Sequence, residues 1–418
     1  MSGTVVVSQL GARMHYAVPR ILASEGQLAH FYTDICATNS WPRLINALPS
    51  TVLPSSLKRL IGRVPKGVAP SLTSTFPAFG VTSAICRLRL KNVVEQTRHA
   101  VWAGSHFSEL VASSGFHGAA GLYAFSGDAL EQMRAAKALG MWTALEQMIA
   151  PREVVEELVQ TEQRSFPDWA GKYEENRYAQ TFAEREKAEW ELADVVICPS
   201  EFVRRNVIAC GGPPHRCVVV PYGIDSQSND RKPTRTNGPL RVLTVGEVGL
   251  RKGSPYVVEA ARIMGSAAQF RMAGPTILPS EIKKNVAALV ELRGIVPRSE
   301  MAKEYQWADV FLLPSVCEGS ATAIYEALAA GLPIICTENA GSVVRHGIDG
   351  FVVPVRDSQA IAEALFELSR NAATRIAMST NARERAADFT VKRYGERLMQ
   401  VLTPLSRKQA PAGTLNQS

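Results

Sequence analysis

The feature that most constrains the fold is an alternation of short apolar strands and longer helical stretches, which occurs twice along the chain. In the first half, helical stretches such as those beginning at Asp128 and Thr181 separate the expected strands, which are 4–9, 122–126, 141–146, 194–200 and 216–223. Strands that alternate with helices in this way favour a parallel sheet covered on both faces.

A polar segment at 226–240 interrupts the alternation and has almost nothing to bury, so it is expected to be an interdomain linker. A second alternation follows, with strands expected at 241–248, 269–274, 292–296, 309–315, 332–337 and 349–354. We therefore predict an α/β fold of two doubly wound, Rossmann-like parallel-sheet domains, at 1–225 and 241–390, that face a central cleft. A C-terminal helix is expected at 391–408, where it could pack back on the N-terminal domain, and 409–418 is expected to be a disordered tail.

Composition narrows the class of protein. The 418 residues suffice for two or three domains, and the hydrophobic content of 46% and charged content of 20% are ordinary for a well-packed soluble protein. No apolar run approaches the ~18–20 residues of a membrane helix, and the N-terminus lacks the features of a signal peptide. The seven cysteines show no zinc spacing. A cytoplasmic protein with reduced cysteines is therefore expected.

The net charge of +7 is concentrated in one region. From Asn39 to Ala100 the only acid is Glu95, whereas nine residues are basic: Arg43, Lys58, Arg59, Arg63, Lys66, Arg87, Arg89, Lys91 and Arg98. Such a patch could contact an anionic membrane at its inner face or an acidic substrate, or it could be a merely solvated basic face. Within it, segment 39–70 could contact a lipid-linked or anionic acceptor or the inner face of a membrane, and the alternative is a simple surface loop. No zinc-finger pattern or RNA-binding signature supports nucleic acid as a partner.

The stretch EGSATAIYEALAAGLPIICT, which begins at Glu318, places two carboxylates eight positions apart. Glu318 is expected in a loop at the carboxyl end of a strand, and Glu326 on an otherwise uncharged helix whose N-cap would be Ser320. A carboxylate in an apolar setting needs hydrogen-bond donors, and the amides of a helix start suit a phosphate. A ribose at Glu326 and sugar hydroxyls at Glu318 would fit. The alternatives are a structural ion pair for Glu326 and a solvated loop acid for Glu318.

A second cue is VGEVGLRKGSPYVVEA at 245–260, where strand, glycine turn, Arg251, Lys252 and helix follow one another directly. Two cations at the carboxyl end of a strand can neutralise a diphosphate, and the alternative is a basic surface turn. The spacing matches neither a Walker A loop nor G-x-G-x-x-G.

Together these segments resemble a known family. EGSATAIYE is similar to the E-x7-E signature of retaining GT-B glycosyltransferases, particularly glycosyltransferase family 4 (group 1), and 193–225, VGEVGLRKG, FRMAGP and 292–315 stand in the order of that family. The resemblance implies transfer of a sugar from a nucleotide-sugar co-substrate to a hydroxyl acceptor, with retention of configuration. It implies no required metal and no tightly bound cofactor. A UDP-sugar is the favoured donor and a GDP-sugar the alternative, in the synthesis of polysaccharide, glycolipid or other glycoconjugates.

Roles carry over to the positions that match. The resemblance implies that the catalytic residues are Glu318, Lys252 and Arg251. It implies that the donor-binding residues are Gly246, Gly294, Ile295, Val296, Gly319, Ser320, Ala321 and Glu326. On the acceptor side the candidates are Gly11, Arg13, His15 and His106.

The chain also departs from the family pattern. Glu247 stands where many members have Arg, Gly-Ser-Ala follows Glu318 in place of Gly-Phe-Gly, and Gly11-Ala12 replaces a pair of glycines. No position clearly matches the active-site histidine of the N-terminal domain. The changes at Glu247 and Ser320 leave open a non-catalytic nucleotide-sugar-binding scaffold. A nucleotide-sugar epimerase or a phosphorylase could also share the predicted architecture.

Overall fold

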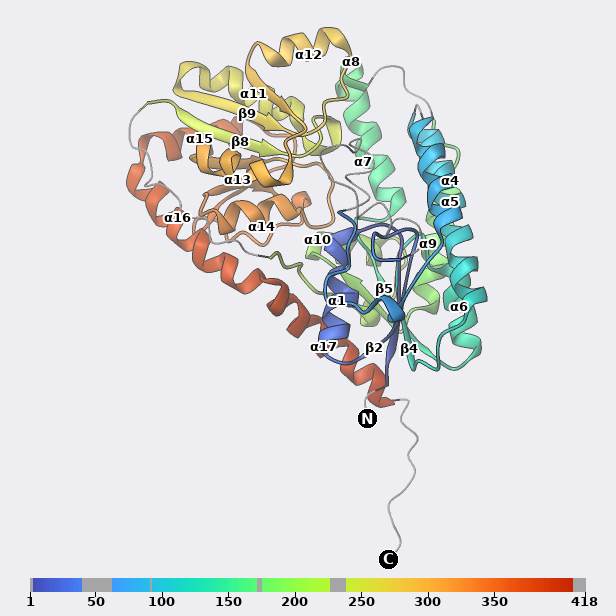
Figure 1. The fold of residues 1–418 in the computed structure, drawn as a ribbon. Helices are drawn as coiled ribbons and strands as arrows, with labels where there is room; N and C mark the ends of the chain where they lie inside the picture. Colours follow the sequence, from blue (N-terminus) through green and yellow to red (C-terminus); the bar gives the residue numbers. More distant parts are fainter. Residues whose placement is uncertain (1–2, 40–61, 91, 171–174, 226–237, 409–418) are drawn as a thin grey trace, which may run out of the picture.

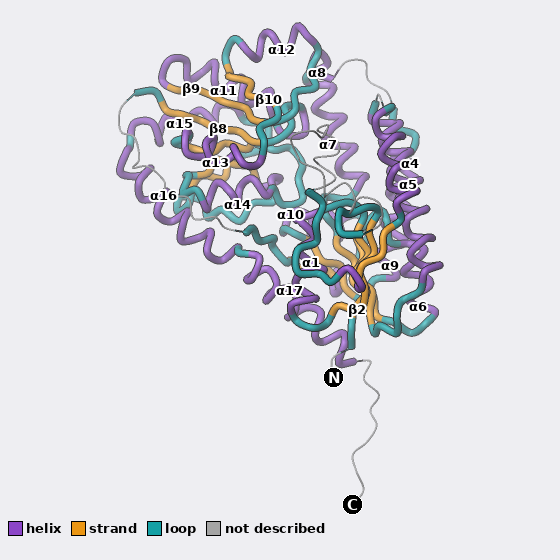
Figure 2. The backbone as a smooth tube through the Cα atoms, in the orientation of Figure 1, coloured by secondary structure: helices purple, strands orange, loops and turns teal. Residues whose placement is uncertain are grey.

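A computed structural model describes residues 3–39, 62–90, 92–170, 175–225 and 238–408. It contains two separate parallel sheets with helices packed against them, as Figure 1 and Figure 2 show. The predicted α/β fold of two Rossmann-like domains is therefore confirmed. The tail 409–418, most of the expected linker and most of segment 39–70, with Lys58 and Arg59, lie outside the described residues.

The first sheet has the strand order β3-β2-β1-β4-β5-β6-β7, and all of its pairs are parallel. Its strands are β1 (Val5–Gln9), β2 (Leu28–Thr33), β3 (Thr73–Thr75), β4 (Gly121–Phe125), β5 (Trp142–Glu146), β6 (Val195–Cys198) and β7 (Cys217–Val219). The sequence analysis did not predict β2 and β3. A histidine, His30, interrupts the apolar run of β2, and β3 has only three residues, so neither shows a strand-like apolar pattern.

Helices cover both faces of the first sheet. They are α1 (Ala17–Ser24), α4 (Pro77–Leu88), α5 (Val93–Ser114), α6 (Leu130–Ala138), α7 (Arg152–Ser165), α9 (Ala179–Leu192) and α10 (Glu201–Ala209). The short helix α8 (Pro167–Ala170) follows α7, and its Trp169 packs against the buried cluster of the second domain. One face carries a buried cluster that includes Phe107, Met133 and Trp190. The cluster on the other face includes Tyr16 and Phe31.

The second sheet has the order β10-β9-β8-β11-β12-β13 and is again parallel. Each of the six strands expected after the polar segment is present, as β8 (Leu240–Val245), β9 (Ala268–Ala273), β10 (Val290–Gly294), β11 (Val310–Leu313), β12 (Ile334–Thr337) and β13 (Gly350–Val353). Its helices are α11 (Ser254–Met264), α12 (Ser280–Ala287), α13 (Arg298–Trp307), α14 (Thr322–Ala329), α15 (Ser358–Arg370) and α16 (Ala372–Ala386).

Two helices join the domains. The C-terminal helix α17 (Val391–Lys408) runs from the second domain along the first, where Tyr394, Leu398 and Leu402 are buried in the same cluster as β1 (Figure 1). Helix α7 contacts the second domain through Glu162, which accepts hydrogen bonds from Tyr256 at 2.8 Å and from Arg356 at 2.5 Å. These two helices therefore help to hold the position of each domain relative to the other. Within the described residues, no helix has the length and apolar character needed to cross a bilayer.

Candidate active site

The two domains meet at Gly319, which lies in the loop between β11 and α14. The Ser200 hydroxyl, which follows β6, donates a hydrogen bond of 2.5 Å to the Gly319 carbonyl. A Cβ atom on Gly319 would lie 1.8 Å from the Met148 carbonyl oxygen and 3.2 Å from the Cα of Ile149, both in the loop after β5. Only glycine permits this approach of the two backbones, so the loop that carries Glu318 lies directly on the domain boundary.

Glu318 is buried, with 9% of its surface exposed, and is therefore not a solvated loop acid. Its Oε1 lies 2.6 Å from Arg251 and 2.8 Å from Lys252. The backbone also links the two loops, since the Arg251 carbonyl accepts a 2.9 Å hydrogen bond from the Val316 amide. Three of the sequence-predicted residues thus form one charge cluster. A buried carboxylate with two cationic partners is stabilised as an anion.

Gly246 allows Lys252 to reach this cluster. Its φ of 138° is one that side chains other than glycine rarely adopt, and a Cβ atom there would lie 2.9 Å from Cε of Lys252. The neighbouring Gly274 approaches Gly246 even more closely, because a Cβ on Gly274 would lie 1.9 Å from the Gly246 carbonyl oxygen. Two glycines, Gly246 and Gly274, therefore leave room at the end of β8 for the Lys252 side chain.

Glu326 has a hydrogen-bond donor that the sequence did not identify. The Tyr305 hydroxyl, from α13, donates to Oε2 of Glu326 at 2.7 Å, and no ion pair among the described residues includes Glu326. Burial, followed by the charge of Glu326, raises the pKa of the Tyr305 hydroxyl well above its usual range. The phenol therefore stays protonated and orients one carboxylate oxygen, while Glu326 itself is only partly buried.

The end of β10 and the turn that follows it carry three of the predicted donor-binding residues. Gly294 adopts a left-handed φ of 65°, Ile295 is 77% exposed and Val296 is half-buried. The Gly294 carbonyl accepts a 2.8 Å hydrogen bond from the Gly274 amide, which ties this turn to the end of β9. An exposed isoleucine beside an open turn offers an apolar surface for a flat ring.

The expectation that Ser320 caps α14 is wrong. Ala321 occupies the N-cap position, and the Ser320 hydroxyl instead bonds the Tyr325 hydroxyl at 2.6 Å and the Gly341 carbonyl at 2.9 Å. The Tyr325 hydroxyl is buried, and a buried hydroxyl group favours a hydrogen-bonding partner, so it competes with the first turn of α14 for the Ser320 side chain. The Ala321 amide is also engaged, by the Ala340 carbonyl at 3.1 Å, whereas the amides of Gly319 and Ser320 have no partner among the described residues.

On the acceptor side, the loop after β1 holds three of the four predicted residues. Gly11 has φ 81° and donates its amide to Asp34 at 3.1 Å, and the exposed Arg13 follows. Met14, His15 and Tyr16 are all left-handed, with φ of 44°, 51° and 60°. A left-handed turn of this kind costs about 1 kcal/mol or more per residue. The turn brings His15 against Arg298 of α13, so the loop reaches the second domain.

Partial burial, and then the Arg298 charge, lower the pKa of His15. His106, the fourth candidate, does not join this loop. It is exposed on α5, where its ring stacks on Trp102 with centroids 5.9 Å apart and its Nδ1 lies 3.7 Å from Glu109. The structure therefore brings Gly11, Arg13 and His15 together and leaves His106 on a separate surface.

Beside the loop lies a cavity of about 440 Å³, whose polar lining includes Arg13, Ser83, Arg87, Gln96, His99 and Asp128. Asp128 is the residue that the sequence analysis missed. It follows β4 and is buried, and burial raises the pKa of its carboxyl to about 7, against the effect of Arg13 and then Arg185. The only signal in the sequence was its position just after an expected strand. The cavity therefore combines cations with a carboxyl group that titrates near neutral pH.

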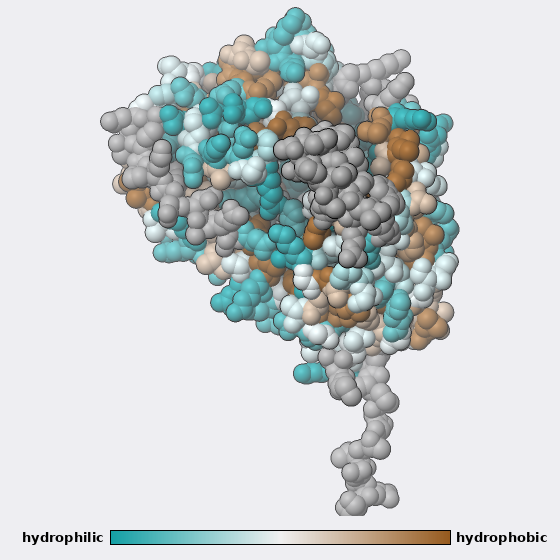
Figure 3. Space-filling view, viewed as in Figure 1, coloured by the Kyte–Doolittle hydropathy of each residue, from teal (hydrophilic) through white to brown (hydrophobic). Residues whose placement is uncertain are grey.

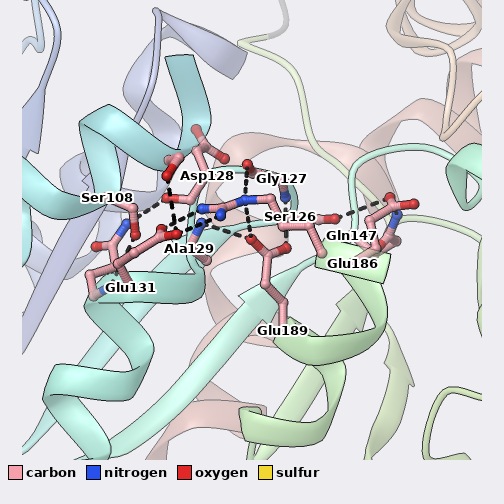
Figure 4. A network of polar contacts seen from close by, with 12 residues as sticks. Ser108, Ser126, Gly127, Asp128, Ala129, Glu131, Gln147, Glu186 and Glu189 are labelled. Carbon is pink, nitrogen blue, oxygen red and sulfur yellow. Dashed lines mark hydrogen bonds and ion pairs between the residues drawn. The ribbon is translucent and has the colours of Figure 1, made fainter. Parts of the chain in front are cut away.

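Helix α9 fixes the loop that carries Asp128, as Figure 4 shows. Glu189 accepts hydrogen bonds from the amides of Gly127 at 2.7 Å and Ala129 at 3.0 Å. Arg185 donates to the Gly127 carbonyl at 2.8 Å and is paired with Glu131 at 2.6 Å. Because these contacts lie on both sides of Asp128, its backbone has one well-defined position.

Among the described residues, no group of three or more His, Cys, Asp or Glu side chains is arranged to hold a metal ion. The charge cluster at Glu318 is instead balanced by side-chain cations.

Comparisons with known proteins point to one family. Residues 239–371 match the family model described as glycosyl transferases group 1, and residues 141–228 match that of glycosyltransferase family 4. Among curated proteins, the chain is 31% identical to the amylovoran biosynthesis glycosyltransferase AmsK of Erwinia amylovora, over 42% of this chain and 47% of that protein. It is 29% identical to the putative colanic acid biosynthesis glycosyltransferase WcaL of Salmonella typhimurium, over 50% and 56%.

A third relative is the UDP-Gal:alpha-D-GlcNAc-diphosphoundecaprenol alpha-1,3-galactosyltransferase of Escherichia coli, which is 27% identical over 41% of this chain and 50% of that protein. The chain thus spans about half the length of the curated relatives it matches. Among solved structures, Anabaena Alr3699/HepE in complex with UDP has a TM-score of 0.63 at 14% identity, over 96% of this chain and 100% of that one. Sucrose-phosphate synthase from Thermosynechococcus elongatus has a TM-score of 0.64 at 17% identity, over 97% and 100%. At such identities the structures establish the shared fold.

Proposed function

Because the chain belongs to the group 1 and family 4 glycosyltransferases with the GT-B fold, we propose that it moves a sugar from a nucleoside diphosphate donor to a hydroxyl acceptor. The product would be a polysaccharide or another glycoconjugate, as the names of the relatives AmsK and WcaL suggest. A UDP-sugar is the favoured donor and a GDP-sugar the alternative. We further propose that the configuration at the transferred carbon is retained and that no metal is required.

The observation that carries the proposal is the convergence of Arg251 and Lys252 on Glu318, at the start of α14 and on the domain boundary. In the proposed complex the donor diphosphate lies between these cations and the amides of Gly319 and Ser320. Glu318 then accepts hydrogen bonds from hydroxyls of the donor sugar, and its charge keeps the two cations in place before the donor arrives.

The nucleoside would extend from the diphosphate toward α13. Glu326 would accept hydrogen bonds from the ribose diol, with its second oxygen held by Tyr305 at 2.7 Å. The base would rest on the turn at Gly294, Ile295 and Val296, where an apolar surface is exposed. This arrangement places the ribose and the diphosphate at opposite ends of the first two turns of α14.

In the proposed reaction the bond between the anomeric carbon and the phosphate oxygen breaks, and negative charge grows on the departing diphosphate. Arg251 and Lys252 stabilise that charge where it forms. The acceptor hydroxyl attacks from the same face of an oxocarbenium-like sugar, and its proton passes to the departing phosphate oxygen. Asp128, in the cavity of the N-terminal domain, would accept a hydrogen bond from the acceptor and orient it. Closure of the domains around Gly319 would exclude water from the reaction.

Thermal stabilisation by UDP, GDP, ADP and their sugars tests the donor site directly. We expect one nucleotide to raise the unfolding midpoint, and we expect Glu326→Ala to abolish that shift. Tyr305→Phe should reduce the affinity about tenfold, since a hydrogen bond to a charged group contributes roughly 1.5 kcal/mol or more. Glu363→Ala, at an exposed position of α15, is the matched control and should respond as the wild type does.

Two outcomes would contradict the proposal. If no nucleotide stabilises the protein, or if Glu326→Ala responds like Glu363→Ala, the donor site is not where we place it. Conversion of the donor sugar into its epimer without any acceptor would instead establish an epimerase.

A further inference from the structure

The outer face of α4 is apolar and open to solvent. Val81, Ile85 and Leu88 recur at the spacing of one helical face, and Leu88 is 87% exposed. Trp102 of the neighbouring α5 is 40% exposed, and its ring packs against that of Phe79 on α4 with centroids 5.9 Å apart. Figure 3 shows apolar residues gathered over α4 and α5 at the upper right of the molecule. We call Val81, Ile85, Leu88 and Trp102 the α4 surface. A contiguous apolar surface of this kind marks an interaction site more often than scattered exposed residues do.

Arginines border the α4 surface. Arg87 and Arg89 lie at the end of α4 and Arg98 lies on α5; all three are exposed, and none forms an ion pair with a carboxylate among the described residues. In the sequence from 39 to 100, Glu95 is the only acid. Apolar side chains with uncompensated cations at their rim match the interface of an anionic bilayer, where the side chains enter the acyl boundary and the cations meet headgroup phosphates.

Helix α4 also forms part of the wall of the 440 Å³ cavity. Ser83 and Arg87 line that cavity together with Arg13 and Asp128, whereas Val81, Ile85 and Leu88 do not. Arg87 therefore lies between the α4 surface and the cavity that we assign to the acceptor. A phosphate at the mouth of the cavity would find Arg87 as its nearest unpaired cation on this helix.

We propose that the α4 surface docks on an anionic lipid bilayer and that the acceptor sugar enters the cavity while still attached to a phosphate-bearing lipid. The docking follows from the surface alone, whereas the identity of the acceptor rests on the proposed function. In this arrangement the bilayer fixes the orientation of the N-terminal domain, and Arg87 holds the lipid phosphate at the entrance to the cavity.

Co-sedimentation of the full chain with vesicles tests the docking. We expect binding to vesicles of phosphatidylglycerol and phosphatidylcholine and little binding to phosphatidylcholine alone. Ile85→Ser with Leu88→Ser should weaken binding about tenfold or more, because two exposed apolar side chains lose their contact with the acyl region. Arg87→Gln with Arg89→Gln should weaken it by at least fivefold for each charge removed. Leu139→Ser with Ile376→Ser is the matched control, since both residues are exposed apolar side chains outside the α4 surface.

The results separate this inference from the proposed function. Equal binding of the α4 variant and the matched control, or no binding of the wild type to anionic vesicles, would overturn the inference. Nucleotide-induced stabilisation of the same variants reports separately on the donor site, and it should remain unchanged in all of them. If no nucleotide stabilises the wild type, that result would count against the proposed function, whether or not the protein binds vesicles.

Discussion

Replacing Gly319 by alanine tests whether the close approach of the two domains is needed for transfer. The new methyl group would lie 1.8 Å from the Met148 carbonyl oxygen, and it would meet backbone rather than a side chain that could move aside. To restore an ordinary contact of 3.4 Å the two segments must separate by about 1.6 Å. The hydrogen bond of 2.5 Å from Ser200 to the Gly319 carbonyl would then lengthen or break.

The expected consequence is a loss of catalysis with little loss of donor binding. A misplacement of about 1 Å between reacting groups can reduce the rate about 100-fold. In the proposed donor site, by contrast, the side chains of Arg251, Lys252 and Glu326 all come from the second domain. Alanine at position 319 keeps its backbone amide, so these donor contacts do not require the loop after β5 to stay in contact with residue 319. We therefore expect the rate of nucleotide release from the sugar donor to fall about 100-fold, while the nucleotide dissociation constant, measured by calorimetry, changes less than threefold.

The matched control is Gly395→Ala, in α17. Its methyl group would contact only the Ile21 side chain, at 3.2 Å, and alanine is favoured over glycine in a helix by up to about 1 kcal/mol. This variant should keep full activity. A fully active Gly319→Ala enzyme would refute the reasoning, because it would mean that the observed contact is not part of the reacting state. An equal loss of nucleotide affinity would show instead that the donor loop itself had been damaged.

Two titrations follow from buried groups. Because the pKa of Asp128 is raised to about 7, the rate of transfer should increase as pH rises through 7 and the carboxylate forms. Asp128→Asn should remove this pH dependence and lower the rate of transfer about 100-fold. The affinity for the nucleotide should stay unchanged. In the folded protein, burial and then the charge of His117 lower the pKa of His30 to about 4. In the unfolded chain the pKa of a histidine is about 6.5, so as pH falls below this value the unfolded state binds a proton that the folded state does not. Urea unfolding should therefore show up to about 3 kcal/mol less stability at pH 4 than at pH 7, and His30→Gln should reduce that difference.

The sequence predicted the two domains because alternation of strand and helix is a local pattern that buried parallel sheets require. Each expected strand of the second domain is present, and so is each of the five expected in the first, whose sheet also contains β2 and β3. The prediction failed at β2 and β3 and at the cap of α14. In all three places the outcome depends on distant partners. Ser320, for example, bonds Gly341 across 21 positions of the chain instead of capping the helix beside it.

The same distinction explains why the residues of the proposed donor site were easier to find in the sequence than those of the proposed acceptor site. Glu318 and Glu326 belong to one strand–loop–helix unit, so their spacing in the sequence already fixes most of their geometry. Within this unit, the sequence still showed no sign of the hydrogen-bond donor to Glu326. Tyr305 lies on the preceding helix and donates to Glu326 only once α13 and α14 pack together.

On the acceptor side no single unit carries the site. Arg13 follows β1, Arg87 lies on α4 and Asp128 follows β4, so the cavity exists only once these distant segments pack together. In the sequence, Asp128 belongs to no motif, and its pKa is raised to about 7 only by burial in the folded protein. A site assembled in this way can change its residues without changing any local motif. This would allow one donor domain to serve many acceptors, because Arg13, Arg87 and Asp128, which we propose to bind the acceptor, lie outside the segments 141–228 and 239–371 that match the family models.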